Sequence, residues 1–164
     1  MYKKNDTVIY IGSGICKIED IRTEHFAKVS TEYYVLRPIS EKSSRFFVPV
    51  GSENGKFTKL MEKQEIDRLF SKVKSCAGVW VDDEKKRSEV YSELLKNIDR
   101  VRIIKMIGEL LERKNGKSPD VKRLKTIDEQ FLKEGRQLIE SELSYVLSIE
   151  KNLVEPLILK KLNA

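Results

Sequence analysis

The 164-residue chain is poor in the residues from which catalytic and metal centres are usually built. It contains one histidine, His25, and two cysteines, Cys16 and Cys76. A structural zinc site takes about four His, Cys or acidic ligands, and no such group stands at a recognisable spacing. Two cysteines are also too few for a disulfide framework, so both are expected to be free thiols in a reducing compartment.

The sequence also lacks the motifs of common enzymes. It has no nucleophile elbow or Walker motif, and the Gly-Ser-Gly at 12–14 is not followed by the Gly-Lys-Ser/Thr of a phosphate loop. No apolar run approaches the roughly 20 residues that cross a bilayer, and the first ten residues do not resemble a signal peptide. These absences predict a cytoplasmic, non-enzymatic protein without a metal, a cofactor or a small-molecule substrate.

Charge is abundant, but neither sign dominates. Charged residues make up 35% of the chain, with a formal net charge of +6. The residues up to Cys76 contain 14 Lys and Arg against 10 Asp and Glu, and the remainder contains 18 against 16. A small basic excess points only weakly to an anionic partner. If the protein binds nucleic acid, local basic clusters must provide the contacts.

The first 50 residues favour short β-strands. The runs TVIYIG, GICKIEDI, TEYYVLRPI and SRFFVPV are rich in Val, Ile, Tyr and Phe and are separated by turn residues. Starts spaced by roughly ten residues predict a small, curved antiparallel sheet or barrel. Pro38 and Pro49 cannot donate ladder hydrogen bonds, so each should mark a strand end or an edge.

From about residue 60 onwards the apolar spacing is helical. A first helix is expected to close one side of the barrel, and Gly78 should break it before a junction that contains Trp80. Further amphipathic helices follow, with candidate N-caps at Asp82 or Asp83, Asp99, Ser118 and Ser148. Short connections between such helices predict a compact bundle.

The expected fold class is therefore α+β. A small β-barrel of about five strands should occupy residues 1–60. A closing helix and the junction should span 61–78, and an all-helical domain should span 79–164.

The order of the sequence motifs resembles one known family. The first strands carry Asp6, Val8, Tyr10, Gly12, Gly14, Ile18 and Ile21, followed by YYVL at 33–36 and VPV at 48–50. A KLM…EI helix at 59–66, a W-x-x-D-x-x-x-R…Y…L stretch at 80–95 and FLKEGRQLIESEL at 131–143 complete the pattern. This arrangement is similar to that of the CarD family of bacterial transcription regulators. Their N-terminal module also occurs in the transcription-repair coupling factor as its RNA polymerase-interacting domain.

The resemblance implies a function. A Tudor-like barrel would bind the β subunit of RNA polymerase. The helical domain would contact promoter DNA at the upstream edge of the −10 element and stabilise the open complex. Several family members insert a tryptophan into the minor groove there, but their tryptophan aligns near Glu84, four residues after Trp80. Polymerase-contacting positions that are often arginine in the family align with Glu24 and Phe47. A monomer is expected.

Adjacent aromatic residues locate the candidate polymerase contact. Phe46 and Phe47 follow one another in a predicted strand, so their side chains point to opposite faces and one of them lies outside the core. An exposed strand edge could add a partner strand, and the outward aromatic ring would add contact area. Together with the resemblance, this pattern gives four candidate polymerase-binding residues: Glu24, Phe26, Arg45 and Phe47.

Two basic clusters are candidates for DNA contact. Each cluster lies at a predicted helix start, where free backbone N–H groups also favour phosphate. Trp80 either inserts into DNA beside them or packs the domains together. The candidate DNA-binding residues are Trp80, Lys85, Lys86, Arg87, Lys122, Arg123 and Lys125. The alternative is a protein-interaction adaptor, in which the same clusters are solvated surface and no DNA is bound.

Overall fold

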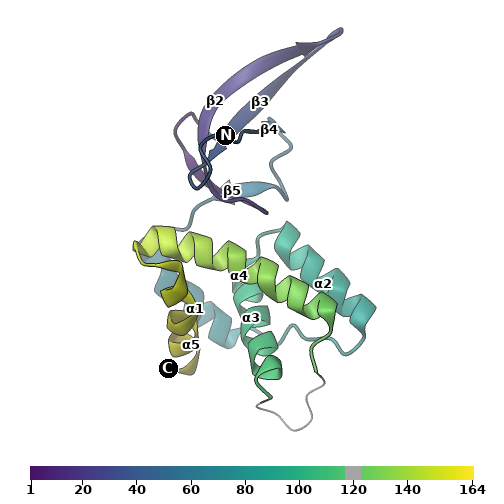
Figure 1. The fold of residues 1–164 in the computed structure, drawn as a ribbon, viewed down its shortest axis with the longest axis vertical. Coiled ribbons are helices and arrows are strands. Elements are labelled where there is room, and N and C mark those ends of the chain that lie inside the picture. Colours follow the sequence, from purple (N-terminus) through teal and green to yellow (C-terminus); the bar gives the residue numbers. More distant parts are fainter. Residues whose placement is uncertain (117–122) are drawn as a thin grey trace. The chain divides into compact units, whose positions relative to one another are not determined.

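The computed structural model describes residues 1–116 and 123–164 and divides the chain into two units, Met1–Leu60 and Met61–Ala164 (Figure 1). The first unit is a β-sheet and the second consists of helices. This arrangement confirms the predicted α+β class.

The sheet unit contains five antiparallel strands in the order β4-β3-β2-β1-β5. They are β1 (Thr7–Tyr10), β2 (Gly14–Phe26), β3 (Val29–Pro38), β4 (Phe46–Pro49) and β5 (Phe57–Lys59). β4 and β5 form opposite edges of the sheet, and the strand pairings of the described residues do not join them. The sheet is therefore open, and the predicted Tudor-like barrel is not confirmed. The edge strands β4 and β5 have only four and three residues, so they offer little backbone for the hydrogen bonds that would close a barrel.

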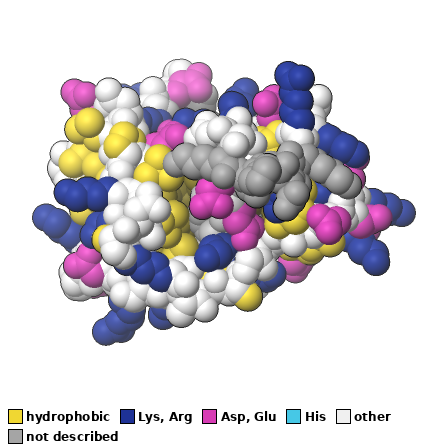
Figure 2. All heavy atoms as spheres, turned by 90° about the horizontal axis from the view of Figure 1, so that it is seen from below, with side chains coloured by type: hydrophobic (Ala, Val, Ile, Leu, Met, Phe, Trp, Pro, Cys, Tyr) yellow, Lys and Arg dark blue, Asp and Glu magenta, His cyan; other side chains and the backbone are white. Residues whose placement is uncertain are grey.

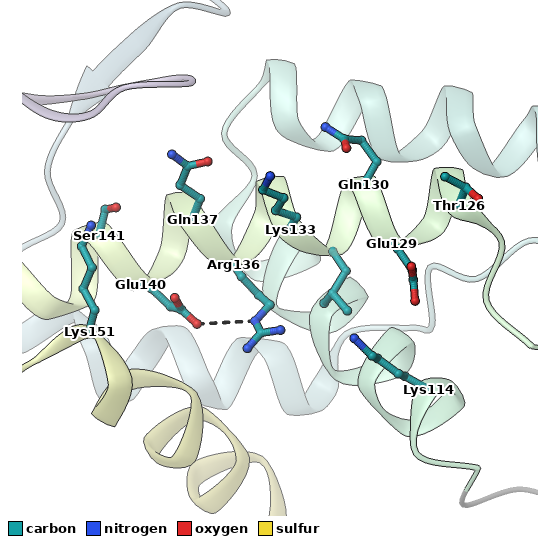
Figure 3. A pocket seen from close by; sticks show the side chains of 11 residues that line it. Lys114, Thr126, Glu129, Gln130, Lys133, Arg136, Gln137, Glu140, Ser141 and Lys151 are labelled. Carbon is teal, nitrogen blue, oxygen red and sulfur yellow. Dashed lines mark ion pairs between the residues drawn. The ribbon is translucent and has the colours of Figure 1, made fainter.

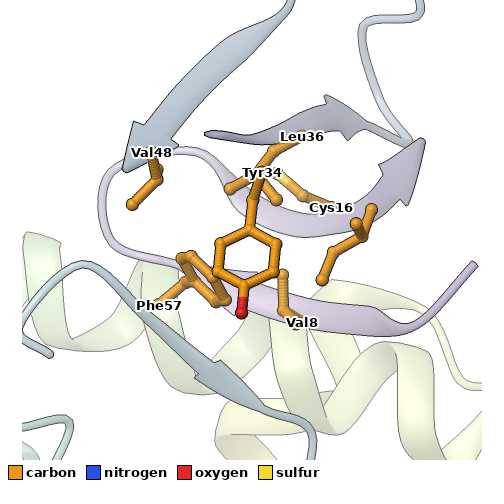
Figure 4. Close-up of a cluster of buried hydrophobic side chains, with 7 residues drawn as sticks. Val8, Cys16, Tyr34, Leu36, Val48 and Phe57 are labelled. Atoms are coloured by element: carbon orange, nitrogen blue, oxygen red, sulfur yellow. The ribbon is translucent and has the colours of Figure 1, made fainter. Parts of the chain in front are cut away.

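One face of the sheet carries the main apolar cluster of this unit, and Ile9, Ile15 and Val35 are buried on the other face. The buried side chains of the cluster are Val8, Cys16, Ile18, Tyr34, Leu36, Val48 and Phe57 (Figure 4). Alternation along β3 places Tyr34 and Leu36 on this face, and Val48 of β4 pairs with Tyr34. Burial raises the pKa of the Cys16 thiol to about 11, so this cysteine is a packing residue rather than a reactive thiolate.

Five α-helices make up most of the second unit within its described residues. They are α1 (Ile66–Ser75), α2 (Glu84–Lys96), α3 (Arg100–Lys114), α4 (Thr126–Leu147) and α5 (Val154–Asn163). Short 3-10 turns at Lys63–Glu65 and Lys151–Leu153 precede α1 and α5. The long helix α4 contacts α2, α3 and α5. None of the described helices is long and apolar enough to span a membrane.

Helix α1 belongs to the helical unit, although the sequence suggested a helix that closes a barrel. It contacts α3 and α5, and its buried side chains are Ile66, Leu69, Phe70 and Val73. These residues repeat at helical spacing and form a single apolar stripe. The stripe contributes to the core of the bundle.

The helix boundaries match some of the predicted caps. Asp83 and Asp99 cap α2 and α3, because their carboxylates accept N–H groups from Lys86 and Arg102 at 2.9 and 3.2 Å. Ser148 does not begin the last helix: it ends α4 in a left-handed conformation with φ of 55°. The predicted cap at Ser118 lies outside the described residues.

Candidate interaction surfaces

Phe47 lies on the face of the sheet opposite to the core. Its neighbour Val48 is buried in the core, so alternation along β4 turns Phe47 to the other side. The Phe47 ring is 50% exposed and meets the ring of Tyr33 edge-on, with centroids 6.4 Å apart. We call this side of the sheet the outer face.

The hairpin of β2 and β3 extends the outer face. Strand pairing sets Arg22 opposite Tyr33, Glu24 opposite Thr31 and Phe26 opposite Val29. Residues two apart in a strand share a face, so Glu24 and Phe26 lie on the same side as Tyr33. Phe26 and Val29 are 65% and 64% exposed. The outer face therefore carries exposed apolar side chains at two places, the hairpin turn and the edge strand β4, and the polar residues Arg22, Glu24 and Thr31 lie between them.

The junction before α2 is held by Glu109 of α3. The Glu109 carboxylate accepts the backbone N–H groups of Val79 and Trp80 at 3.1 and 3.0 Å. Burial raises the pKa of Glu109, although these two hydrogen bonds oppose the shift. A Cβ atom at Gly78 would lie 2.7 Å from the Glu109 carboxylate, so the glycine permits this close approach. Gly78 therefore serves the packing of the junction against α3.

The half-buried indole ring of Trp80 lies between two arginines. The guanidinium carbons of Arg87 and Arg113 are 4.0 and 3.7 Å from the ring centroid. Two cations cannot both occupy the centre of one face at these distances, so they cover opposite faces. The indole N–H donates a 3.0 Å hydrogen bond to Asp82. Both faces and the polar edge of the ring thus have partners within the helical unit.

A buried ion pair joins the start of α2 to the start of α4. Arg87 donates from Nε and Nη2 to the two carboxylate oxygens of Asp128, at 2.7 and 2.9 Å. Both side chains are at most 3% exposed. Burial disfavours the Arg87 cation, but the hydrogen bonds to Asp128 and its negative charge outweigh this effect. The pKa of Arg87 is therefore raised. A second, exposed pair links Lys125 to Glu84 at the same helix starts.

These two pairs bring the separate basic clusters of the sequence together. Lys85 and Lys86 in the first turn of α2 and Arg123 and Lys125 before α4 are all exposed. Two helix N-termini at one place also direct positive dipole ends toward an anion, although Asp83 and Asp128 already accept one N–H group at each of them. We call these four residues, with the two helix starts, the basic end of the helical unit.

Residues 2–61 match the family model described as CarD-like/TRCF RID domain. The chain carries a CarD-like domain. The family resemblance of the sequence is thereby confirmed for residues 2–61. The match coincides with the sheet unit, Met1–Leu60, and so includes the whole outer face. Among curated proteins, none matches the chain.

Within the CarD-like domain, Arg45 is engaged in internal contacts. Its guanidinium pairs with Glu19 and donates to the carbonyl oxygens of Lys42 and Ser44. Its side chain is one-third exposed. Arg45 therefore holds the loop that leads into β4, and any partner contact would use only its exposed part. The predicted residues Glu24, Phe26 and Phe47 share the outer face.

One predicted DNA-contacting residue, Arg87, needs revision outside the CarD-like domain. Arg87 is buried against Asp128 and Trp80, and it also donates to the carbonyl oxygens of Val81 and Asp82, so its guanidinium is not available to a phosphate. Sequence alone did not reveal Asp128 as its partner. Lys122 lies outside the described residues.

A polar groove runs along α4, with a cavity volume of about 670 Å³ (Figure 3). Lys114 and Lys133 line it together with Glu129 and Glu140, and Arg136 pairs with Glu140 at 3.5 Å. Both signs of charge therefore alternate along the groove. The same mixture is visible on the face in Figure 2, where Lys and Arg are interspersed with Asp and Glu. Among the described residues, no cluster of three or more His, Cys, Asp or Glu could hold a metal ion.

The contacts of Trp80 predict the effect of removing it. Trp80→Ala would delete a half-buried ring with two cation contacts, and we expect a loss of about 1–3 kcal/mol in unfolding free energy. Chemical denaturation of the full chain measures this value. Trp80→Phe, which keeps an aromatic face for both arginines, should recover most of the loss. Wild-type stability of Trp80→Ala would contradict a packing role.

Proposed function

We propose that this chain is a non-enzymatic transcription regulator that bridges RNA polymerase and promoter DNA. The outer face of the CarD-like domain binds the polymerase β subunit. The basic end of the helical unit contacts DNA near the upstream edge of the −10 element and stabilises the open complex. The observation that carries this proposal is the exposure of Phe26, Val29 and Phe47 on the outer face of a domain that matches the CarD-like/TRCF RID model, a match that suggests a polymerase-interacting role.

Two features support the outer face as the polymerase contact. Phe26, Val29 and Phe47 are half exposed or more, and aromatic side chains are enriched where proteins bind one another. β4 is also an edge strand, so a partner strand can pair with its free side while the apolar side chains add contact area.

The geometry of the basic end supports DNA contact. Lys85, Lys86 and Arg123 are exposed cations without an ion pair among the described residues, and they lie at two neighbouring helix starts. Phosphates are favoured there by side-chain charge and by the free backbone N–H groups together.

The adaptor remains the second candidate, because negative charge lies close to the same surface. Lys125 is paired with Glu84, and Asp82 and Asp83 stand just before α2. These carboxylates would weaken phosphate binding. An adaptor would bind polymerase or another protein with the outer face and leave DNA untouched.

A two-part experiment tests the proposal. The full chain is mixed with purified core polymerase and a forked promoter duplex, and co-purification is followed by a footprint of the open complex. A regulator co-purifies with polymerase and extends protection at the upstream edge of the −10 element. Co-purification without added protection leaves the adaptor, and failure to bind polymerase rejects the regulator and leaves only an adaptor for another protein.

Salt dependence of DNA binding gives a further prediction. If Lys85, Lys86 and Arg123 each neutralise one phosphate, the log–log salt slope should be about −2.7 or steeper. Affinity for forked DNA would then fall at least about 40-fold between roughly 50 and 200 mM salt. Fluorescence anisotropy of a labelled duplex measures the slope. Lys85→Ala combined with Lys86→Ala should flatten it by about 1.8, whereas a flat slope in the unchanged chain would favour the adaptor.

A further inference from the structure

The two arginines that cover Trp80 are held very differently. Arg87 is fixed by hydrogen bonds to both carboxylate oxygens of Asp128 and to the carbonyl oxygens of Val81 and Asp82. It is buried, so it cannot leave the ring without breaking the ion pair between α2 and α4. One face of the indole is therefore permanently covered.

Arg113 has no such anchoring. It lies in the last turn of α3, is partly buried, and its guanidinium stacks on the indole ring without a hydrogen bond or ion pair to another described residue. Glu109, one turn earlier, attracts Arg113 electrostatically, but its carboxylate already accepts the N–H groups of Val79 and Trp80. Arg113 can therefore move away while the junction stays in place.

A DNA phosphate would compete well for this guanidinium. An aromatic face offers a cation only its quadrupole, whereas a phosphate offers a full negative charge and two acceptors that match the guanidinium fork. Release of Arg113 would uncover one face of Trp80. The exposed indole could then pack against a nucleotide, with its other face still supported by Arg87.

We propose that Arg113 is a phosphate-binding residue and a removable cover of Trp80. When the helical unit binds DNA, the guanidinium moves from the indole to the DNA backbone, and the uncovered face of Trp80 contacts a base or sugar. This inference rests on the proposed DNA contact. It also gives Trp80 two consecutive roles: it packs the junction in the free protein and contacts DNA in the complex.

Trp80 is the single tryptophan of the chain, so its fluorescence reports directly on the cover. The unchanged chain and Arg113→Ala are compared by acrylamide quenching and by titration with a forked promoter duplex. We expect Arg113→Ala to be quenched more strongly in the free state. The salt slope of its DNA binding should be shallower by about 0.9 than that of the unchanged chain, because one phosphate contact is lost.

Two further variants separate the roles. Arg113→Lys keeps the charge but not the planar stack, so it should retain the salt slope while its free tryptophan is quenched like that of Arg113→Ala. Arg102→Ala removes the same charge from an exposed site in the first turn of α3 and should change neither measurement.

The outcomes separate this inference from the proposed function. If the unchanged chain binds forked DNA but Arg113→Ala has the same slope and the tryptophan emission does not respond to DNA, Arg113 is not a phosphate contact and the proposed function stands. If the unchanged chain does not bind DNA, both are overturned. Equal quenching of the free unchanged chain and free Arg113→Ala would reject the cover itself.

Discussion

Replacement of Asp128 with alanine is expected to destabilise the helical unit by about 3–5 kcal/mol, because the buried Arg87 guanidinium would lose its counter-ion. The two side chains share hydrogen bonds of 2.7 and 2.9 Å and are almost completely buried. Asp128 also accepts the backbone N–H of Lys125 at the start of α4, at 3.2 Å. The substitution therefore removes a charge partner and a helix cap together.

The exposed pair at the same helix starts provides a matched control. Lys125→Ala removes the ion pair with Glu84. The side chains of Lys125 and Glu84 are 60% and 45% exposed, and solvated pairs of this kind contribute less than about 1 kcal/mol to the free energy of unfolding. Chemical denaturation of both variants, followed by circular dichroism, gives the two differences in unfolding free energy. Equal losses would show that the buried pair contributes no more than the exposed one.

A double substitution distinguishes the charge from the packing. Arg87→Met combined with Asp128→Leu replaces both ions by apolar side chains of similar size, and such replacements are often nearly neutral. We expect the double variant to be more stable than Asp128→Ala. The basic end would keep its exposed lysines, so this variant also tests whether DNA binding survives without Arg87.

The burial of Arg87 shows what the sequence could and could not reveal. Three consecutive basic residues at a helix start are typical of a solvated surface. However, Arg87 stands four residues before Tyr91, and Tyr91 and Leu94 are buried, so helical spacing turns Arg87 to the apolar face. That signal was present in the sequence. Its partner Asp128 was not predictable, because the pair joins residues 41 positions apart through packing of two helices.

The sheet illustrates a similar limit. Alternation and turn residues located the strands around Tyr34 and Val48, and adjacent aromatics placed Phe47 outside the core. Closure of a barrel was not encoded in those local patterns. It depends on pairing between the two edges, and the edge strand Phe57–Lys59 has only three residues and was not recognised as a strand. Local signals therefore predicted the faces of the strands better than the pairing of the edges.

Charges placed on the outer face should disrupt polymerase binding most strongly. Phe26→Asp combined with Phe47→Asp replaces two exposed aromatic rings of the outer face by carboxylates, and loss of two aromatic anchors costs about 3 kcal/mol or more. The affinity for core polymerase should therefore fall by about 100-fold or more. Both side chains are at least half exposed, so the fold of the CarD-like domain should be retained. Biolayer interferometry with immobilised polymerase and a thermal unfolding curve measure the two effects.

Ile39→Asp is the matched control for this loss. Ile39 is 43% exposed in the same domain but follows the far end of β3, away from the hairpin turn between Phe26 and Val29. The same apolar-to-acidic change there should reduce binding only slightly, because Ile39 lies neither at the hairpin turn nor in β4. Equal losses from the control and the double variant would indicate a general effect of added negative charge. Unchanged binding by a folded double variant would remove the outer face from the polymerase contact and leave the free edge of β4 to carry it through backbone hydrogen bonds alone.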